Sequence, residues 1–402
     1  MCDLGGMDKL VLHVDMDRFY CAVEEKHNPS LRNIPFAVCG NPEMRHRIVM
    51  SANSIARNYG VRAGLSFTDA RLLCPSLRYV TVDDNKNLTE AKAAREVYYK
   101  YSDTVIPYGL DESWLILEDG VTWHEAAQIA ELIKLEIMYS LGLSASVGVS
   151  YNLIFSKIGS EYQKPNGITV ITKYNYREII WPLPVKELLL VGDVRQRVLT
   201  SHGIRTIGDI ANADPQYLTK LLRSKVGYDL KQFANGDDRN FHPENDKIGS
   251  IGNTITPPKD LKNNDEVSAV LYMLTSAVCA RLKKHGLRTR CVAINIRDNK
   301  FNTMTRQCTL NTATDNINNV FNHAYLLFTG NYSWQNPLRS VGVRATNLID
   351  STQTSLFNTD EYVIMIDANS RLKALTERFG KLEVESAGAL GRWSICAEDI
   401  RC

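Results

Sequence analysis

The spacing of apolar positions in the first 171 residues predicts a small α+β domain. Residues 9–17 (KLVLHVDMD) and 143–151 (LSASVGVSY) are short, mostly apolar runs of the kind that form buried strands. Between them, apolar side chains recur at helical spacing at about 86–101 and at 123–141. This order of strands and helices predicts a ferredoxin-like split βαβ sheet with its helices on one face.

Two acidic residues interrupt an apolar stretch at 105–117 (VIPYGLDESWLIL). Neighbouring residues of a strand point to opposite faces, so Asp111 or Glu112 would need a partner or a cation if the stretch is buried. The alternative is a strand end with both acids in water. In a ferredoxin-like sheet, however, the end of strand 9–17 lies beside this hairpin and brings Asp15 to the same place. Three carboxylates so close together favour bound cations, and oxygen ligands of this kind suit Mg²⁺.

The remaining pattern predicts further domains in this α+β multidomain chain of 402 residues. Residues 36–82 alternate short strands with two short helices, as in a small inserted lobe. Residues 188–211 predict a helix, a glycine-containing hairpin, a second helix that ends at Gly203, and a new helix from Thr206. After a polar stretch at 235–247, the pattern predicts a second β-α-β-β-α-β unit.

Charge is unevenly distributed, although the whole chain carries only +2. Residues 247–349 contain thirteen basic and five acidic side chains, so this segment carries +8 and the rest of the chain carries −6. Such a cationic module indicates a nucleic-acid partner, with an unpartnered basic surface as the alternative. The nine cysteines form no CxxC pair, and no apolar run is long enough to span a membrane. These features predict a cytoplasmic protein with no membrane partner.

Four motifs occur in the order and spacing of one enzyme family: HVDMDRFYCAVEE (13–25), SANSIARNYGVRAG (51–64), YGLDESWL (108–115) and VGVSYNLIFSKIGSEYQKPNGITVI (147–171). They resemble the Y-family translesion DNA polymerases, in particular the DNA polymerase IV or DinB-like branch. The resemblance implies a DNA-directed DNA polymerase of the mutator type that acts in DNA repair. It would transfer nucleotides from dNTPs to the primer 3′-OH of primer–template DNA, opposite damaged or undamaged template and without proofreading.

The resemblance also implies domain boundaries. The family fold has a catalytic palm, an inserted fingers lobe, a thumb with a helix-hairpin-helix module, and a little finger that binds DNA. In this chain the implied ranges are 1–26 and 84–171 for the palm, 27–83 for the fingers, 172–242 for the thumb, 243–350 for the little finger, and 351–402 for a clamp-binding motif and C-terminal tail.

The family's catalytic carboxylates have matches in this sequence. Asp15 and Asp111 match the aspartates that bridge two Mg²⁺ ions in each active site. The backbone carbonyl of Met16 matches a further metal ligand. Glu112 matches the carboxylate that serves the metal at the primer 3′-OH. Asp17 matches none of these ligands, and we expect it to be structural.

The nucleotide-binding residues of the family also have matches. Phe19 and Tyr20 stand where backbone N–H groups face the triphosphate, and Tyr20 matches the steric gate that excludes a ribonucleotide 2′-OH. A purely structural role of Tyr20 in the core is the alternative. The other matched contacts to the nucleotide are Ser51, Ser54, Arg57 and Lys164.

The sequence departs from the family pattern in two places. Ser54 stands where family members commonly have a tyrosine that contacts the γ-phosphate, and a serine would not reach as far. Gly109, Leu110 and Ser113 flank the acidic pair where SIDEA is usual. Both acids are retained, so we still expect an active enzyme.

The DNA-binding and clamp-binding residues come last in the chain. Gly192 lies in the hairpin whose backbone N–H groups would hold a DNA phosphate. Gln353, Leu356 and Phe357 resemble the motif that docks bacterial polymerases on the sliding clamp. We expect one sheet face of the basic module to contact the sugar-phosphate backbone through Arg288, Arg290, Arg297, Lys300 and Arg306.

Two other functional classes fit part of the sequence. A non-catalytic DNA-binding or clamp-binding protein derived from a polymerase would keep the basic module, but it could lose Asp15, Asp111 or Glu112, which are all present. A different Mg²⁺-dependent nucleotidyl transferase, such as a cyclase, would have no need of a thumb or a basic module. We therefore predict a translesion DNA polymerase that is monomeric and becomes nucleoid-associated when engaged.

Overall fold

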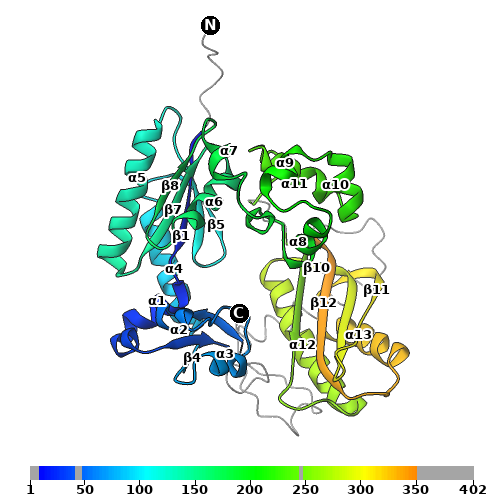
Figure 1. Ribbon diagram of the computed structural model, residues 1–402. Coiled ribbons are helices and arrows are strands. Elements are labelled where there is room, and N and C mark those ends of the chain that lie inside the picture. The colour runs from blue at the N-terminus through cyan, green and yellow to red at the C-terminus, as the bar shows by residue number, and fades with distance from the viewer. Residues whose placement is uncertain (1–8, 41–47, 244–247, 351–402) are drawn as a thin grey trace. The chain divides into compact units, whose positions relative to one another are not determined.

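The computed structural model describes residues 9–40, 48–243 and 248–350 (Figure 1). These residues form two compact units, the first ending at residue 243 and the second beginning at residue 248. The first unit has two sheets and the second has one, and each unit has its own hydrophobic core. Among the described helices, none is long and apolar enough to cross a membrane.

A five-stranded sheet in the first unit carries the predicted carboxylates. Its order is β5-β6-β1-β7-β8, and β1 pairs antiparallel with both β6 and β7. All six residues of β1 and of β7 are buried, as expected for central strands of a sheet covered on both faces. The strands are β1 (Val11–Met16), β5 (Thr104–Tyr108), β6 (Glu112–Ile116), β7 (Ala145–Ser150) and β8 (Ile168–Ile171).

Helices cover both faces of this sheet. α4 (Asp84–Tyr98) and α5 (Trp123–Glu136), which continues into a π-helical turn (Ile137–Leu141), pack on one face. α6 (Leu153–Tyr162) packs on the other face and comes so close that a Cβ at Gly148 would lie 1.9 Å from a backbone oxygen of α6. The expectation of helices on one face is therefore wrong for α6, a helix that follows the split βαβ unit. The apolar side chains of α6 need a second sheet face to bury them.

A smaller sheet lies between α1 (Phe19–His27) and α4 in the sequence. Its order is β3-β2-β4, with β2 and β3 antiparallel and β2 and β4 parallel. Ala56 of α2, Ala70 of α3 and Val49 of β3 belong to its small core. Its elements are a 3-10 turn (Pro29–Asn33), β2 (Phe36–Cys39), β3 (Val49–Ala52), α2 (Ser54–Asn58), α3 (Phe67–Leu73) and β4 (Arg78–Thr81).

Short helices complete the first unit: α7 (Tyr176–Ile179), α8 (Asp193–Ser201), α9 (Ile207–Asn212), α10 (Pro215–Leu222) and α11 (Val226–Ala234). The helix predicted before Gly192 is wrong, because a 3-10 turn (Val185–Glu187) precedes α8 instead. Leu188 is buried in the helical core without being helical. Gly203 follows α8 with a φ of 83°, and Thr206 caps α9, both as the sequence predicts.

The second unit is a four-stranded antiparallel sheet of order β11-β10-β12-β9 with two helices. Val292, Ile294 and Ile296 of β10 pack with α12 and α13, so both helices cover one face. The elements are β9 (Ser250–Ile255), α12 (Asn264–Lys284), β10 (Leu287–Asp298), β11 (Thr303–Thr314), α13 (Ile317–Asn331) and β12 (Leu338–Asp350).

Candidate active site

Asp15 and Glu112 lie directly opposite each other on paired strands. The antiparallel register of β1 and β6 pairs Asp15 with Glu112 and His13 with Trp114. Because side chains alternate along a strand, His13, Asp15 and Glu112 share the sheet face that α6 covers. Asp15 is only 3% exposed. The strand register therefore places two predicted metal ligands side by side at the edge of a buried face.

Asp111 lies in the tight turn that joins β5 to β6. Its carbonyl accepts a hydrogen bond of 3.0 Å from the N–H of Met16, which ties the turn to the end of β1. Gly109 adopts a φ of 81°, a backbone conformation that favours glycine, and its carbonyl accepts a bond from Arg95 of α4. This turn geometry explains the unusual glycine before the acidic pair. Burial raises the pKa of Asp111, and the neighbouring charge of Glu112 raises it further.

The ammonium group of Lys164 lies against Asp15. Its Nζ lies 2.7 Å from Asp15 Oδ2 and 2.7 Å from Glu161 Oε1 of α6. Burial raises the pKa of Asp15 to about 8; Lys164 opposes this shift and Glu161 adds to it. Lys164 is therefore at the site, as predicted, but it contacts a carboxylate there.

Glu112 is held from two sides by residues that sequence reasoning missed. Its Oε2 lies 3.2 Å from His13 Nε2 and accepts a hydrogen bond from Lys157 of α6. Burial alone would raise the pKa of Glu112, but His13 and Lys157 lower it to about 2. The Lys157 ammonium also lies 5.0 Å from the ring centroid of Tyr108. The spacing of Lys157 from Glu161 and Lys164, on and just after one helix, is the sequence signal that could have revealed Lys157.

Asp17 anchors the backbone beside this cluster. Its Oδ1 accepts a 2.8 Å bond from Ser146 Oγ, and its Oδ2 accepts a 2.8 Å bond from the N–H of Asn166. Both carboxylate oxygens are thus occupied by structural hydrogen bonds. The expectation that Asp17 is structural agrees with this geometry.

The donor set suits a hard divalent cation. Asp15, Asp111 and Glu112 supply carboxyl oxygens at one strand junction, and Lys164 and Lys157 contact Asp15 and Glu112 respectively. In the part of the chain that is described, no three Asp, Glu, His or Cys side chains stand close enough together to hold one metal ion. The ammonium groups of Lys157 and Lys164 contact the oxygens that Glu112 and Asp15 would offer to a metal. A metal ion and the two lysines would therefore compete for these oxygens.

The first turn of α1 offers free backbone N–H groups beside these carboxylates. The helix begins at Phe19, directly after the site strand, and Arg18 at its N-cap makes no side-chain capping bond. First-turn N–H groups lack intrahelical acceptors and favour anions. Tyr20 is half-buried next to Phe19, and burial and then the charge of Asp111 raise its pKa. Phe19 and Tyr20 therefore adjoin the acidic cluster.

The other predicted nucleotide contacts lie on the smaller sheet and α2. Ser51 is buried, and it lowers the pKa of the Cys21 thiol, which burial raises. Ser54 begins α2 and accepts a 2.7 Å bond from Arg18. Arg57 of α2 is exposed and donates from Nε to the carbonyl of Ala52 at 3.0 Å.

The sheet face of the second unit that the helices leave uncovered is basic. Arg297 points to this face, and Arg344 of β12, which pairs with Ala293, shares it. Arg306 does not lie on this face, contrary to our expectation: it pairs with Ile294 and donates to Asn331 of α13. The hairpin register, which the sequence does not reveal, decides this difference.

The other predicted DNA contacts are dispersed. Arg288 and Arg290 begin β10 and are partly buried, and Lys300 is exposed in the turn after β10. The guanidinium of Arg297 lies 4.7 Å from the ring centroid of Phe301 in the same turn. In the first unit, Gly192 is the N-cap of α8, and no atom lies within 4 Å of a Cβ built there.

Comparisons with known proteins decide the family. The model of the impB/mucB/samB family matches residues 14–161, and the model of that family's C-terminal domain matches residues 249–356. The chain belongs to this family. A DNA polymerase IV of Acetivibrio thermocellus is 39% identical over 94% of this chain and 96% of its own length. The DNA polymerase IV 1 of Bacillus subtilis is 30% identical over 96% of this chain and 94% of its own length.

A solved structure supports the same fold. A chimera of Y-family DNA polymerases matches with a TM-score of 0.75 over 85% of this chain and 99% of its own, at 24% identity. The chain is thus a DinB-like Y-family polymerase with a mixed α+β fold of several sheets, and the prediction of a DNA-directed DNA polymerase in translesion synthesis and DNA repair is confirmed. Membership of this family implies dependence on a divalent metal and DNA and dNTPs as substrates.

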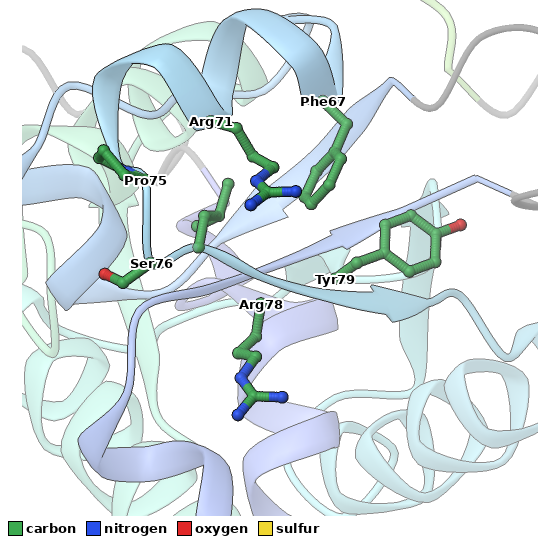
Figure 2. Close-up of a pocket in the computed structure, with 7 residues that line it drawn as sticks. Phe67, Arg71, Pro75, Ser76, Arg78 and Tyr79 are labelled. Atoms are coloured by element: carbon green, nitrogen blue, oxygen red, sulfur yellow. The ribbon is translucent and has the colours of Figure 1, made fainter.

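One hollow of the first unit is separate from the acidic cluster. A hollow of about 500 Å³ between α3 and the edge strand β4 is lined by Phe67, Arg71 and Tyr79, among others, and by none of the predicted site residues (Figure 2). The motif of Gln353, Leu356 and Phe357 lies outside the described residues. The candidate active site is therefore located by strand register and side-chain contacts, and not by this hollow.

Proposed function

We propose that this chain adds deoxynucleotides to a primer 3′-OH at the junction of β1, β6 and the β5–β6 turn. The observation that supports this most strongly is the register that sets Asp15 directly across from Glu112, next to the turn of Asp111. Two Mg²⁺ ions, held by these carboxylates and the carbonyl of Met16, would activate the primer hydroxyl and stabilise the charge of the departing pyrophosphate.

The chain's own groups then have separate roles. His13 and Lys157 hold Glu112 in one orientation, which keeps this ligand aimed at the primer terminus. The first-turn N–H groups of α1 bind the triphosphate, and Lys164 and Arg57 supply positive charge to it. Pyrophosphate is the product, and the proposal includes no proofreading nuclease.

Tyr20 is proposed as the steric gate. Its ring is half-buried against the core of the five-stranded sheet, and burial and then the charge of Asp111 raise its pKa, so it would lie near the sugar of a nucleotide held at the carboxylates. A ring packed against C2′ leaves no room for a 2′-OH. A purely structural Tyr20 would account for the burial but would predict no sugar selectivity.

The remaining assignments concern domains and partners. We propose that the five-stranded sheet is the palm, the β3-β2-β4 sheet the fingers, the helices α7–α11 the thumb, and the second unit the little finger. Residues 353–357 would dock a monomeric enzyme on the bacterial sliding clamp in the cytoplasm. A clamp pull-down tests the last point: binding should be lost when Leu356 and Phe357 are changed to Ala.

Primer extension tests the proposed reaction and its sugar selectivity together. The wild type should extend a primer by single nucleotides on undamaged and lesion-bearing templates when Mg²⁺ and dNTPs are supplied. Tyr20→Ala should retain dNTP incorporation and gain ribonucleotide incorporation, whereas Tyr20→Phe should stay selective because the ring is kept. Absence of extension by the wild type would refute the reaction, and unchanged selectivity of Tyr20→Ala would refute the gate.

A further inference from the structure

Arg18 forms an unusual link between the carboxylate strand and α2. It follows Asp17 in a left-handed backbone conformation, with φ of 50° and ψ of 41°, which is uncommon for a residue with a Cβ. Its Nη1 donates a 2.7 Å hydrogen bond to Ser54 Oγ, at the first residue of α2. This side chain therefore extends from the start of α1 to the start of α2.

The charge of Arg18 is not neutralised by a neighbouring acid. Within residues 9–40, 48–243 and 248–350, no carboxylate lies within 4.0 Å of the guanidinium of Arg18 or of Arg57. Both helix starts near Arg18 also lack an acidic residue in their first turn. Two guanidinium groups that no described carboxylate contacts thus lie near the free N–H groups of α1.

Arg18 and Arg57 are brought to the same turn of α2. Ser54 and Arg57 are three residues apart, so they lie on one face of this helix. Arg57 is fixed through its Nε by the carbonyl of Ala52, which leaves its outer nitrogens for a ligand. The Ser54 hydroxyl positions Arg18 in a similar way, because it accepts a bond from only one of the guanidinium nitrogens.

We propose that Arg18 binds the terminal phosphate of the incoming nucleoside triphosphate, with Ser54 as the residue that positions it. A planar guanidinium is suited to two phosphate oxygens at once. The assignment gives Ser54 a role at a position where a serine is too short to reach the phosphate itself. It rests on the proposed function, because it places the triphosphate between α1 and α2.

The affinity for the terminal phosphate tests this role. Arg18→Gln should raise KM for dNTP about 10- to 100-fold and change kcat by less than about threefold, since a charge-assisted bond to the substrate is lost while the carboxylates are intact. The KM for dNTP of Arg18→Lys should lie between those of the wild type and of Arg18→Gln. Arg32→Gln, an exposed arginine of the turn before β2, is the matched control and should leave KM unchanged.

Direct binding separates this proposal from the catalytic one. In competition with dNTP, the wild type should bind tripolyphosphate more tightly than pyrophosphate, and Arg18→Gln should lose this preference. The double variant Arg18→Gln, Ser54→Tyr should recover dNTP affinity if a tyrosine at position 54 reaches the phosphate. Thermal unfolding of each variant shows whether the fold is intact.

Three outcomes would overturn the proposal in an enzyme that extends primers. KM for dNTP could be unchanged in Arg18→Gln, or the loss of affinity could be equal for tripolyphosphate and pyrophosphate. KM could also fall, which would mean that the bond between Arg18 and Ser54 hinders nucleotide binding. A wild type that fails to extend primers would instead refute the polymerase reaction at this site.

Discussion

His13 Nε2 lies 3.2 Å from Glu112 Oε2, while His13 Nδ1 lies 2.7 Å from Ser160 Oγ of α6. Burial lowers the pKa of His13 to about 4, so at pH 7 the imidazole is neutral and carries one N–H. That proton can point to Glu112 only if Nδ1 accepts a hydrogen bond from Ser160. The Ser160 hydroxyl also lies 2.8 Å from the carbonyl of Lys157, and its single proton can serve only one of these two acceptors. The tautomer of this buried histidine therefore decides whether Nε2 donates to Glu112.

His13→Gln should lower kcat about 10- to 100-fold, as expected when a group that orients a metal ligand is lost. Primer–template affinity should stay within about twofold, because His13 is fully buried and touches no DNA-binding residue. Single-nucleotide incorporation and a DNA-binding titration measure the two effects. Ser160→Ala is the companion variant, and it should lower kcat by a smaller factor. Full activity of His13→Gln would show that Glu112 needs no orienting partner.

The Mg²⁺ requirement should depend on pH. Burial raises the pKa of Asp15 to about 8, so below pH 8 this carboxyl group holds a proton that a cation must displace. The Mg²⁺ concentration for half-maximal activity should therefore rise as pH falls from 8 to 6, by at most about tenfold per unit. Glu112 should not contribute, since its pKa is held near 2. A Mg²⁺ requirement that is equal at pH 6 and pH 8 would contradict this role of Asp15.

Asp17→Asn should reduce stability more than it impairs the active site. A single amide oxygen cannot replace both carboxylate oxygens that accept from Ser146 and the N–H of Asn166, so one buried donor loses its partner. The expected loss is about 1–3 kcal/mol in the free energy of unfolding, measured by denaturant titration. Asp103→Asn, at an exposed acid, is the control. An unfolding midpoint equal to that of the control would show that these bonds are not stabilising.

The apolar pattern predicts the elements of the first unit well, because burial decides them. The helix expected at about 86–101 is Asp84–Tyr98, and the strand expected at 143–151 is Ala145–Ser150. The closeness of Asp15 to Glu112 follows from the strand order expected of a ferredoxin-like sheet. The pattern fails before Gly192, where Leu188 is buried in a non-helical segment.

Contacts that depend on packing could not be predicted. His13 and Lys157 reach Glu112 only because α6 crosses the second face of the sheet, and no local pattern indicates that crossing. The orientation of Arg306 depends on the register of a long hairpin, and a shift by one residue would move it to the other face. The bond from Arg18 to Ser54 also depends on packing, because it joins residues that are 36 positions apart in the chain.

The central claim is that Asp15, Asp111 and Glu112 form one metal-dependent site for nucleotidyl transfer. Single-turnover incorporation of one dNTP by Asp111→Asn tests it most directly, with Asp119→Asn, at a surface acid 3.7 Å from Lys9, as the matched control. We predict that Asp111→Asn loses at least about 1,000-fold in rate while it keeps its thermal stability and DNA affinity, because only a charge at the metal site is removed. An Asp111→Asn enzyme that incorporates the nucleotide as fast as the control would contradict the claim.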